Sequence, residues 1–183
     1  MYRREEQKTA DFRADYASHA DFCKVLEQEM KALYLLSFLL TANHHQAEQC
    51  FAAAAEQALQ EESVFKEWAR SWIKRRLIEN AIGIVFPASA GSSGKWDFWS
   101  AGQHKAGGDD EIDAVTQLPP LERFVFVMSI LERYSVWDCS LLLGCGTKNV
   151  LKARMRALRR LPGPVARIPR GEPRASRLAE IPA

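Results

Sequence analysis

The sequence contains few of the patterns that mark secreted, membrane or disulfide-rich proteins. Its four cysteines are scattered without a C-x-x-C pair, which argues against both a zinc site and a disulfide framework. A membrane-spanning helix needs roughly 18 apolar residues, and the longest apolar runs, Leu33–Leu36 and Phe38–Leu40, are far shorter. The charged N-terminus is followed by no apolar stretch of the signal-peptide type. We therefore expect a cytoplasmic protein with reduced cysteines and no membrane partner.

Patterns that carry catalysis or cofactor binding are also scarce. The glycines between Gly91 and Gly108 are irregularly spaced and form no phosphate-binding loop before a helix. We find no nucleophile–base–orienter set. His44, His45 and Glu48 offer two or three neighbouring ligands, which are too few for a metal centre without a further convergent set. The sequence therefore predicts no enzymatic activity, no catalytic residue, no cofactor and no metal site.

Apolar residues recur at three- and four-residue steps along much of the chain, which is the period of an amphipathic α-helix. No strand-like alternation longer than a few residues interrupts them. The predicted fold class is all-α, with two small helical domains joined by a linker and a helix-turn-helix as the second domain. The pattern predicts helices at about 18–40, 45–61, 63–84, 121–133, 136–143 and 147–161.

Composition marks the boundaries between these units. A polar leader precedes the N-terminal helical domain, which is predicted at 18–86. Residues 87–117 are rich in glycine, serine and alanine and are predicted to be a linker. An aromatic cluster that includes Trp96 and Trp99 is unusual for a free linker and is a candidate for docking on one of the domains. The helix-turn-helix domain is predicted at 118–161.

Charge is nearly balanced overall, at +2, but it is concentrated at the C-terminal end. Residues 144–183 hold ten Lys and Arg against two Glu, a local net charge of +8. Residues 1–143 are left with 15 basic and 21 acidic residues, a net charge of −6. A basic end on an acidic body is typical of a nucleic-acid contact. Five of the eight prolines lie among arginines in 162–183, which predicts a disordered tail.

The helix predicted at 147–161 separates apolar from basic residues. On a helical wheel of about 100° per residue, one side carries Val150, Leu151, Met155, Ala157, Leu158 and Leu161. The other side is basic, and residues near the start of such a helix contact base edges while later cations hold phosphates. We assign Thr147, Lys148, Asn149 and Lys152 to bases and Arg156, Arg159 and Arg160 to phosphates, with Arg154 near the apolar side and reaching outward along its stem.

The residues before this helix support the assignment. Ser135 and Asp138 have the spacing of a capping box and predict the start of a short helix. Gly144 suits the left-handed position at the end of that helix, and Gly146 completes a tight turn. A short helix, a glycine turn and a basic helix form the pattern that fills a major groove. The alternative, a solvated basic face on a packing helix, leaves the capped start and the turn unexplained.

The C-terminal third contains a set of separated residues in one register: Leu118, Pro119, Arg123, Val125, Phe126, Glu132, Ser135, Leu142, Leu143 and Gly144. This set resembles the promoter-reading domain of bacterial sigma factors of the extracytoplasmic-function type. The family pattern is L-P-x-x-x-R-x-V-F, then a glutamate, a serine, and leucine-leucine-glycine before the turn. The end of the last helix, Arg156–Leu161, is also similar. The resemblance implies that this part of the chain binds double-stranded promoter DNA.

The N-terminal half resembles the first helical domain of the same family. Leu33–Leu36, Leu40-Thr41 and Gln46–Glu48 are similar to the segment that leads into its polymerase-binding helix. Phe65, Trp68 and the basic helix after them are similar to its promoter-melting segment. The resemblance implies polymerase contacts at Glu48 and Gln49 and promoter-strand contacts at Trp68, Trp72, Lys74 and Arg75. For the two tryptophans the default prediction is a place in the core, and stacking on an unpaired base is the alternative.

Two positions depart from the family pattern and leave alternatives open. Ala52–Ala55 replaces a polar stretch that contacts the polymerase clamp, and Arg75 stands where the family has an asparagine. An alanine face lacks the hydrogen-bonding groups that fix a polar interface. The leading hypothesis is a transcription initiation factor that directs RNA polymerase to promoters, with promoter DNA, core polymerase and an anti-sigma protein as implied partners. The alternatives are a sigma-like regulator that binds DNA but not polymerase, and a helical interaction module for an acidic protein.

Overall fold

The computed structural model describes residues 15–61, 63–87 and 110–161. Within these ranges the fold is all-α, as the sequence predicts, and extended residues pair only at an isolated bridge between Tyr16 and Phe65. None of the helices in these ranges is both long and apolar enough to cross a membrane. The aromatic cluster with Trp96 and Trp99, a candidate for docking, and the predicted disordered tail lie outside the described residues.

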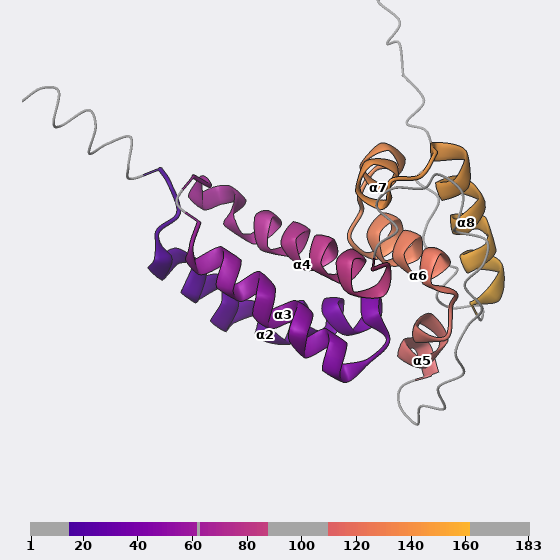
Figure 1. The fold of residues 1–183 in the computed structure, drawn as a ribbon, viewed down its shortest axis with the longest axis horizontal. Coiled ribbons are helices and arrows are strands. Elements are labelled where there is room, and N and C mark those ends of the chain that lie inside the picture. The colour runs from indigo at the N-terminus through magenta and orange to yellow at the C-terminus, as the bar shows by residue number, and fades with distance from the viewer. Residues whose placement is uncertain (1–14, 62, 88–109, 162–183) are drawn as a thin grey trace, which may run out of the picture.

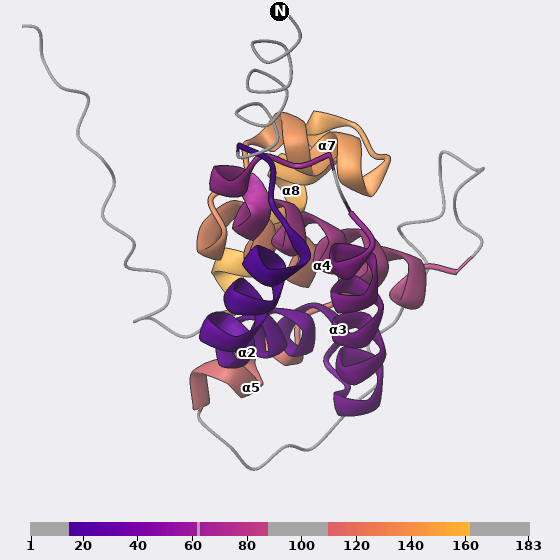
Figure 2. The same ribbon diagram turned by 90° about the vertical axis from the view of Figure 1, so that its left-hand side faces the viewer.

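The N-terminal unit is a bundle of three helices, α2 (His19–Thr41), α3 (His44–Leu59) and α4 (Ala69–Val85). A 3-10 turn, η1 (Lys66–Trp68), leads into α4. All three helices pack against one another, and α4 extends toward the C-terminal unit (Figures 1 and 2). The bundle therefore supplies the surface on which the rest of the described chain rests.

Side-chain caps set the helix starts in this bundle. Ser18 and Asp21 form a capping box in which Ser18 Oγ accepts from the Asp21 N–H at 3.3 Å and the carboxylate accepts from the Ser18 N–H at 2.8 Å. The Ser18 hydroxyl also donates to the carboxylate at 2.7 Å, and this bond, together with the one from the Ser18 N–H, holds the pKa of Asp21 below its usual value. At α3, Asn43 Oδ1 accepts from the Gln46 N–H at 3.1 Å. Local sequence alone is enough to begin both helices.

Burial along η1 and α4 differs from the prediction at the N-terminal end. Ile73, Leu77 and Ile78 are fully buried, as expected. Trp68, predicted as core by default, is 56% exposed, so that prediction is wrong. At about 100° per residue, Trp68 lies opposite the buried side of α4, which Ala69, Ile73 and Leu77 form. Trp72 is half-buried.

The C-terminal unit contains four short helices and a π-helical turn. They are α5 (Asp110–Thr116), α6 (Pro120–Phe126), η2 (Val127–Leu131), α7 (Val136–Leu143) and α8 (Thr147–Arg160). The first, α5, lies in the range predicted as a linker and was not predicted, because two helical turns are too short for a clear period. The helix predicted at 121–133 is found as α6 followed by η2. Both α7 and α8 begin at the predicted residues.

Two left-handed residues bracket α7. Ser135 Oγ accepts from the Asp138 N–H at 3.1 Å, and the carboxylate accepts from the Ser135 N–H at 3.2 Å, which completes the predicted capping box. Arg133 before it has φ 59° and Gly144 after it has φ 60°. Glycine adopts this conformation without steric cost, whereas a residue with a Cβ adopts it uncommonly. The chain therefore reverses sharply on both sides of α7.

The four cysteines are free thiols. Cys50 and Cys139 are buried, and burial raises the pKa of each thiol to about 11. Cys50 Sγ donates to the Leu77 carbonyl at 3.1 Å and so joins α3 to α4. Cys23 and Cys145 are half-buried. The burial of Cys50 and Cys139 favours the protonated thiol, which is the unreactive form.

The side chain of Arg123 joins the C-terminal unit to the bundle. It is buried, and its guanidinium donates to the carbonyl of Leu40 at 3.0 Å, of Thr116 at 3.2 Å and of Leu118 at 3.1 Å. Leu40 lies in the last turn of α2, and the other two carbonyls lie at the end of α5. Carbonyls at helix C-termini are unsatisfied and partly negative, so one cation serves both helix ends. Burial lowers the pKa of Arg123 to about 10, so the group is still charged at neutral pH.

Further contacts reinforce this junction. Lys74 Nζ on α4 lies 2.7 Å from Glu132 Oε2. The rings of Phe86 and Phe124 have centroids 5.3 Å apart. Buried residues of the two units belong to one continuous hydrophobic cluster. The division into two domains accordingly stays a prediction from sequence.

We expect Arg123→Met to lower the free energy of unfolding by about 3 kcal/mol, because buried main-chain carbonyls lose a charged donor. Urea unfolding followed by circular dichroism measures the change. Arg159→Met, at an exposed position of α8, is the matched control and should change stability by less than about 0.5 kcal/mol. Equal stability of the two variants would contradict the role assigned to Arg123.

Candidate nucleic-acid interface

The last helix, α8, has a buried side and an exposed basic side. Val150, Ala153 and Ala157 are buried where the helix packs against α6 and α7. Thr147 and Arg154 are half-buried. The exposed residues are Lys148, Asn149, Leu151, Lys152, Met155, Arg156, Arg159 and Arg160. The cations that the DNA-binding hypothesis needs on the surface are therefore on the surface.

Two apolar residues of α8 lie elsewhere than predicted. Leu151 and Met155 were placed on the packed side, but they are 49% and 53% exposed, so that placement is wrong. The buried side is centred near Val150 and Ala157, and on a wheel Leu151 and Met155 lie about 100° and 140° away from Val150. The small Ala153 completes the buried side. Both apolar side chains consequently share the exposed surface with the cations.

The turn before α8 is held by main-chain and side-chain hydrogen bonds. Ser140 Oγ donates to the Cys145 carbonyl at 2.6 Å, and the Cys145 N–H donates to the Ser140 carbonyl at 3.1 Å. The residue that caps α8 is Gly146, which has no side chain to offer. The first N–H groups of α8, at the positive end of the helix, thus lack a side-chain acceptor.

Most cations on the exposed side of α8 have no acidic partner. Across the residues that the structure describes, the ion pairs involve α2, α4, η1, Glu132 and the Arg160–Glu122 pair. The α8 cations outside these pairs are Lys148, Lys152, Arg154, Arg156 and Arg159. An unpaired surface cation keeps its full attraction for an anion because no carboxylate competes for it. The exposed side of α8 is therefore a concentrated positive surface.

Arg160 differs from the other cations of α8. Its Nε lies 3.1 Å from Glu122 Oε2, at ion-pair distance but outside hydrogen-bond geometry. The Glu122 side chain is only 7% exposed. A buried carboxylate without a partner is costly, so part of the charge of Arg160 compensates Glu122. The phosphate contact predicted for Arg160 competes with this structural role.

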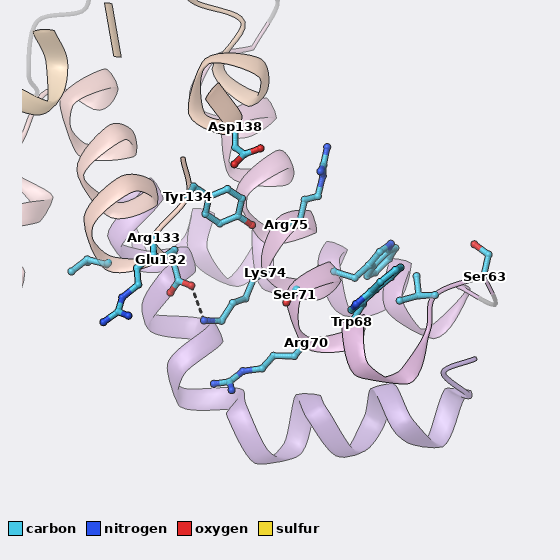
Figure 3. Close-up of a pocket in the computed structure, with 13 residues that line it drawn as sticks. Ser63, Trp68, Arg70, Ser71, Lys74, Arg75, Glu132, Arg133, Tyr134 and Asp138 are labelled. Atoms are coloured by element: carbon cyan, nitrogen blue, oxygen red, sulfur yellow. Dashed lines mark hydrogen bonds and ion pairs between the residues drawn. The ribbon is translucent and has the colours of Figure 1, made fainter. Parts of the chain in front are cut away.

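A groove of about 1080 Å³ lies between α4 and the segment that joins η2 to α7 (Figure 3). The four residues predicted to contact a promoter strand all line it: Trp68, Trp72, Lys74 and Arg75. Arg133 and Tyr134 line it from the C-terminal unit. Burial raises the pKa of the Tyr134 phenol, and the nearby charge of Glu132 adds to the effect. The structure brings the predicted strand-contact residues together.

Three of the four cations that line this groove, Arg70, Lys74 and Arg75, are already paired; the fourth, Arg133, has no ion pair among the described residues. Lys74 Nζ lies 2.7 Å from Glu132, and Arg75 Nε lies 3.0 Å from Glu79. Arg70 pairs with a glutamate of α2 at 2.6 Å. A phosphate in the groove has to displace these carboxylates, so its net gain is smaller than on α8.

The two tryptophans of the groove differ in how accessible their rings are to a ligand. Trp72 packs on Phe22, with ring centroids 5.7 Å apart, and the Arg76 guanidinium lies 4.8 Å from the Trp72 ring. Trp68 makes an edge contact with Phe65, at 5.2 Å between centroids, and stays largely exposed. Of the two, Trp68 has the ring that is accessible to a stacking partner.

The residues predicted to contact polymerase lie on the surface of α3. Glu48 and Gln49 are exposed, and Gln49 Nε2 lies 3.1 Å from His45 Nε2. His44 points elsewhere, with Nδ1 3.0 Å from the Tyr34 hydroxyl. Within the described ranges no group of three or more His, Cys, Asp and Glu side chains is arranged to hold a metal ion.

Comparisons with protein-family models, with curated proteins and with solved structures gave no match to this chain. The resemblance to sigma factors therefore rests on the sequence motifs. Sequence patterns did not predict the structural roles of two neighbouring charges in α6. Glu122 pairs with Arg160 of α8, and Arg123 joins α6 to the end of α2. A signal was present, because both charges directly precede the apolar run 124–128, where a charge needs a partner.

We expect Arg160→Met to lower the free energy of unfolding by about 1 kcal/mol, because it leaves the Glu122 carboxylate buried and unpaired; solvent around the exposed Arg160 limits the effect. In a Glu122→Gln background the same substitution should have little effect. Thermal unfolding of the four chains gives the coupling between the two residues. An effect of Arg160→Met that is the same in both backgrounds would refute the pairing.

Proposed function

We propose that α8 binds the major groove of double-stranded DNA and that the chain is a transcription initiation factor of the sigma-factor type, which directs RNA polymerase to promoters. The observation that carries the proposal is the row of exposed cations on α8, Lys148, Lys152, Arg156 and Arg159, which form no ion pair within the part of the chain that the structure describes. DNA presents a dense line of phosphates, and each cation that meets one releases a condensed counterion. The unpaired state of these cations makes α8 the strongest candidate contact.

The elements before α8 suit this role. In the proposed complex α7, the Gly144–Gly146 turn and α8 act as a helix-turn-helix, with α8 in the groove. Asn149, in the first turn of α8, is exposed and is the type of side chain that contacts adenine with two hydrogen bonds. Arg156 and Arg159, farther along, are placed to hold phosphates.

The groove beside α4 is proposed as the contact for a melted promoter strand. Its exposed Trp68 offers a face for stacking on an unpaired base. The Arg75–Glu79 pair lies at the surface, where ion pairs are worth only about 0.2–1 kcal/mol, so a phosphate can displace it at modest cost. This contact is expected to be weaker than that of α8 and to follow it.

We expect duplex affinity to fall steeply with salt and the double variant Lys148→Ala/Lys152→Ala to reduce the slope of log K against log[salt] by about 2. The matched control is Lys24→Ala/Lys31→Ala, which removes two exposed lysines of α2. Fluorescence anisotropy with labelled duplexes at several salt concentrations measures both. An unchanged slope in the α8 variant, or an equal loss in the control, would refute the assignment.

The exposed face of α3 is the proposed binding surface for core RNA polymerase. The proposed location of the protein is the cytoplasm, and an anti-sigma protein is a further proposed partner. Glu48 and Gln49 provide exposed polar groups there. Ala52, one turn farther along, is exposed and provides none. That exposed alanine favours a second candidate function, a DNA-binding regulator that does not engage polymerase.

Polymerase capture separates the two candidates. If the chain is an initiation factor, it should co-purify with core polymerase and support transcription from a defined start, and Glu48→Ala/Gln49→Ala should weaken capture by about tenfold, which corresponds to the ~1.4 kcal/mol of a polar contact. The matched control, Glu27→Ala/Gln28→Ala, makes the same pair of substitutions at an exposed site on α2 and should not change polymerase capture.

Sequence-specific duplex binding without polymerase capture would favour the regulator. Capture of an acidic protein, with random and selected duplexes both ignored, would refute both DNA-binding functions and favour an interaction module. Selection of duplexes from a random pool, with and without polymerase, distinguishes these outcomes in one experiment.

A further inference from the structure

Leu151 and Met155 form an exposed apolar pair on α8. They are 49% and 53% exposed and lie one turn apart, at i and i+4, on the same side of the helix. Neither packs into the hydrophobic cluster that holds α8 in place. Because exposed apolar area is unfavourable in water, this pair calls for a contact that removes it from solvent.

Cations lie on both sides of the pair. Lys148 precedes Leu151 by three residues and Arg159 follows Met155 by four, so both neighbour the pair on one side. Arg154 follows Leu151 by three residues and lies toward α7, where its charge lowers the pKa of Cys139 against the larger effect of burial. The apolar pair thus has exposed cations on one side and the half-buried Arg154 on the other.

This arrangement is complementary to one kind of surface. The major groove of DNA has phosphates along both margins, and its floor carries the C5-methyl group of each thymine, the apolar feature of that groove. An acidic protein also attracts cations, but the cations from Lys148 to Arg159, which have no ion pair among the described residues, match long rows of anions better than a local acidic patch.

We propose that Leu151 and Met155 contact thymine C5-methyl groups in the major groove and are specificity-determining residues of α8. The inference rests on the proposed function, since it requires that α8 enters the groove. Four residues of helix span about 6 Å, and base pairs are about 3.4 Å apart. The two thymines are therefore about two base pairs apart.

The test replaces thymine by uracil, which removes only the methyl group. A duplex recovered by selection from a random pool is synthesised with deoxyuridine at one thymine position at a time, and binding is measured by fluorescence anisotropy at fixed salt. Two positions about two base pairs apart should each lose about fourfold in affinity, the loss expected for one methyl group removed from an apolar contact. Substitution at other thymines should change affinity by less than about twofold.

Variants assign each methyl to a side chain. Leu151→Ala should abolish the uracil effect at one position and Met155→Ala at the other, since each removes the partner of that methyl. Leu35→Ala, at an exposed leucine of α2, should leave both effects intact. Lys152→Ala should weaken the thymine and uracil duplexes equally.

Failure of this inference differs from failure of the proposed function. If duplexes bind with the expected salt dependence but no thymine position responds to uracil, or if the response persists in both alanine variants, the methyl contact is refuted and DNA binding stands. If no duplex binds, the proposed function is refuted and the methyl contact with it.

Discussion

A single buried guanidinium determines how the described parts of this chain are joined. Arg123 donates to the carbonyl of Leu40, 83 residues earlier in the sequence, and to carbonyls at the end of α5. The adjacent residue, Glu122, is buried as well and pairs with Arg160 of α8. Two neighbouring charges in α6 therefore connect the bundle on one side and the basic helix on the other. The orientation of α8 relative to α4 depends on both.

The two basic surfaces of the molecule differ in the state of their charges. On α4, the carboxylates of Glu132 and Glu79 lie within 3.0 Å of lysine and arginine nitrogens, so the surface is basic in sequence but largely neutral in effect. On α8, Lys148 and Lys152 have no such partners among the described residues. A count of basic residues does not distinguish α4 from α8, whereas the ion pairs on α4 make α8 the stronger candidate for binding an anion.

Features encoded by neighbouring residues were predictable, and features that depend on distant contacts were not. The capping box at Ser135 and the left-handed Gly144 act on their own backbone, so sequence alone located the ends of α7. Trp68 and Leu151 lie outside the buried sides of their helices, and the predictions were wrong because they placed most apolar residues of each helix on the packed side, whereas the width of that side depends on which neighbours cover the helix. The partners of Arg123 lie on other helices, which no local pattern specifies. The use of α8 in DNA binding, predicted from its basic side, is still a prediction.

The sharp reversals at Arg133 and Gly144 have a consequence for how this part of the molecule opens. They separate the eight residues of α7 from the hydrogen-bond ladders of the helices on either side. A helix of that length is not stable in isolation, so α7 persists only while Cys139 and Leu143 stay docked. Amide hydrogens of α7 should consequently exchange with solvent as one cooperative segment, earlier than those of the bundle.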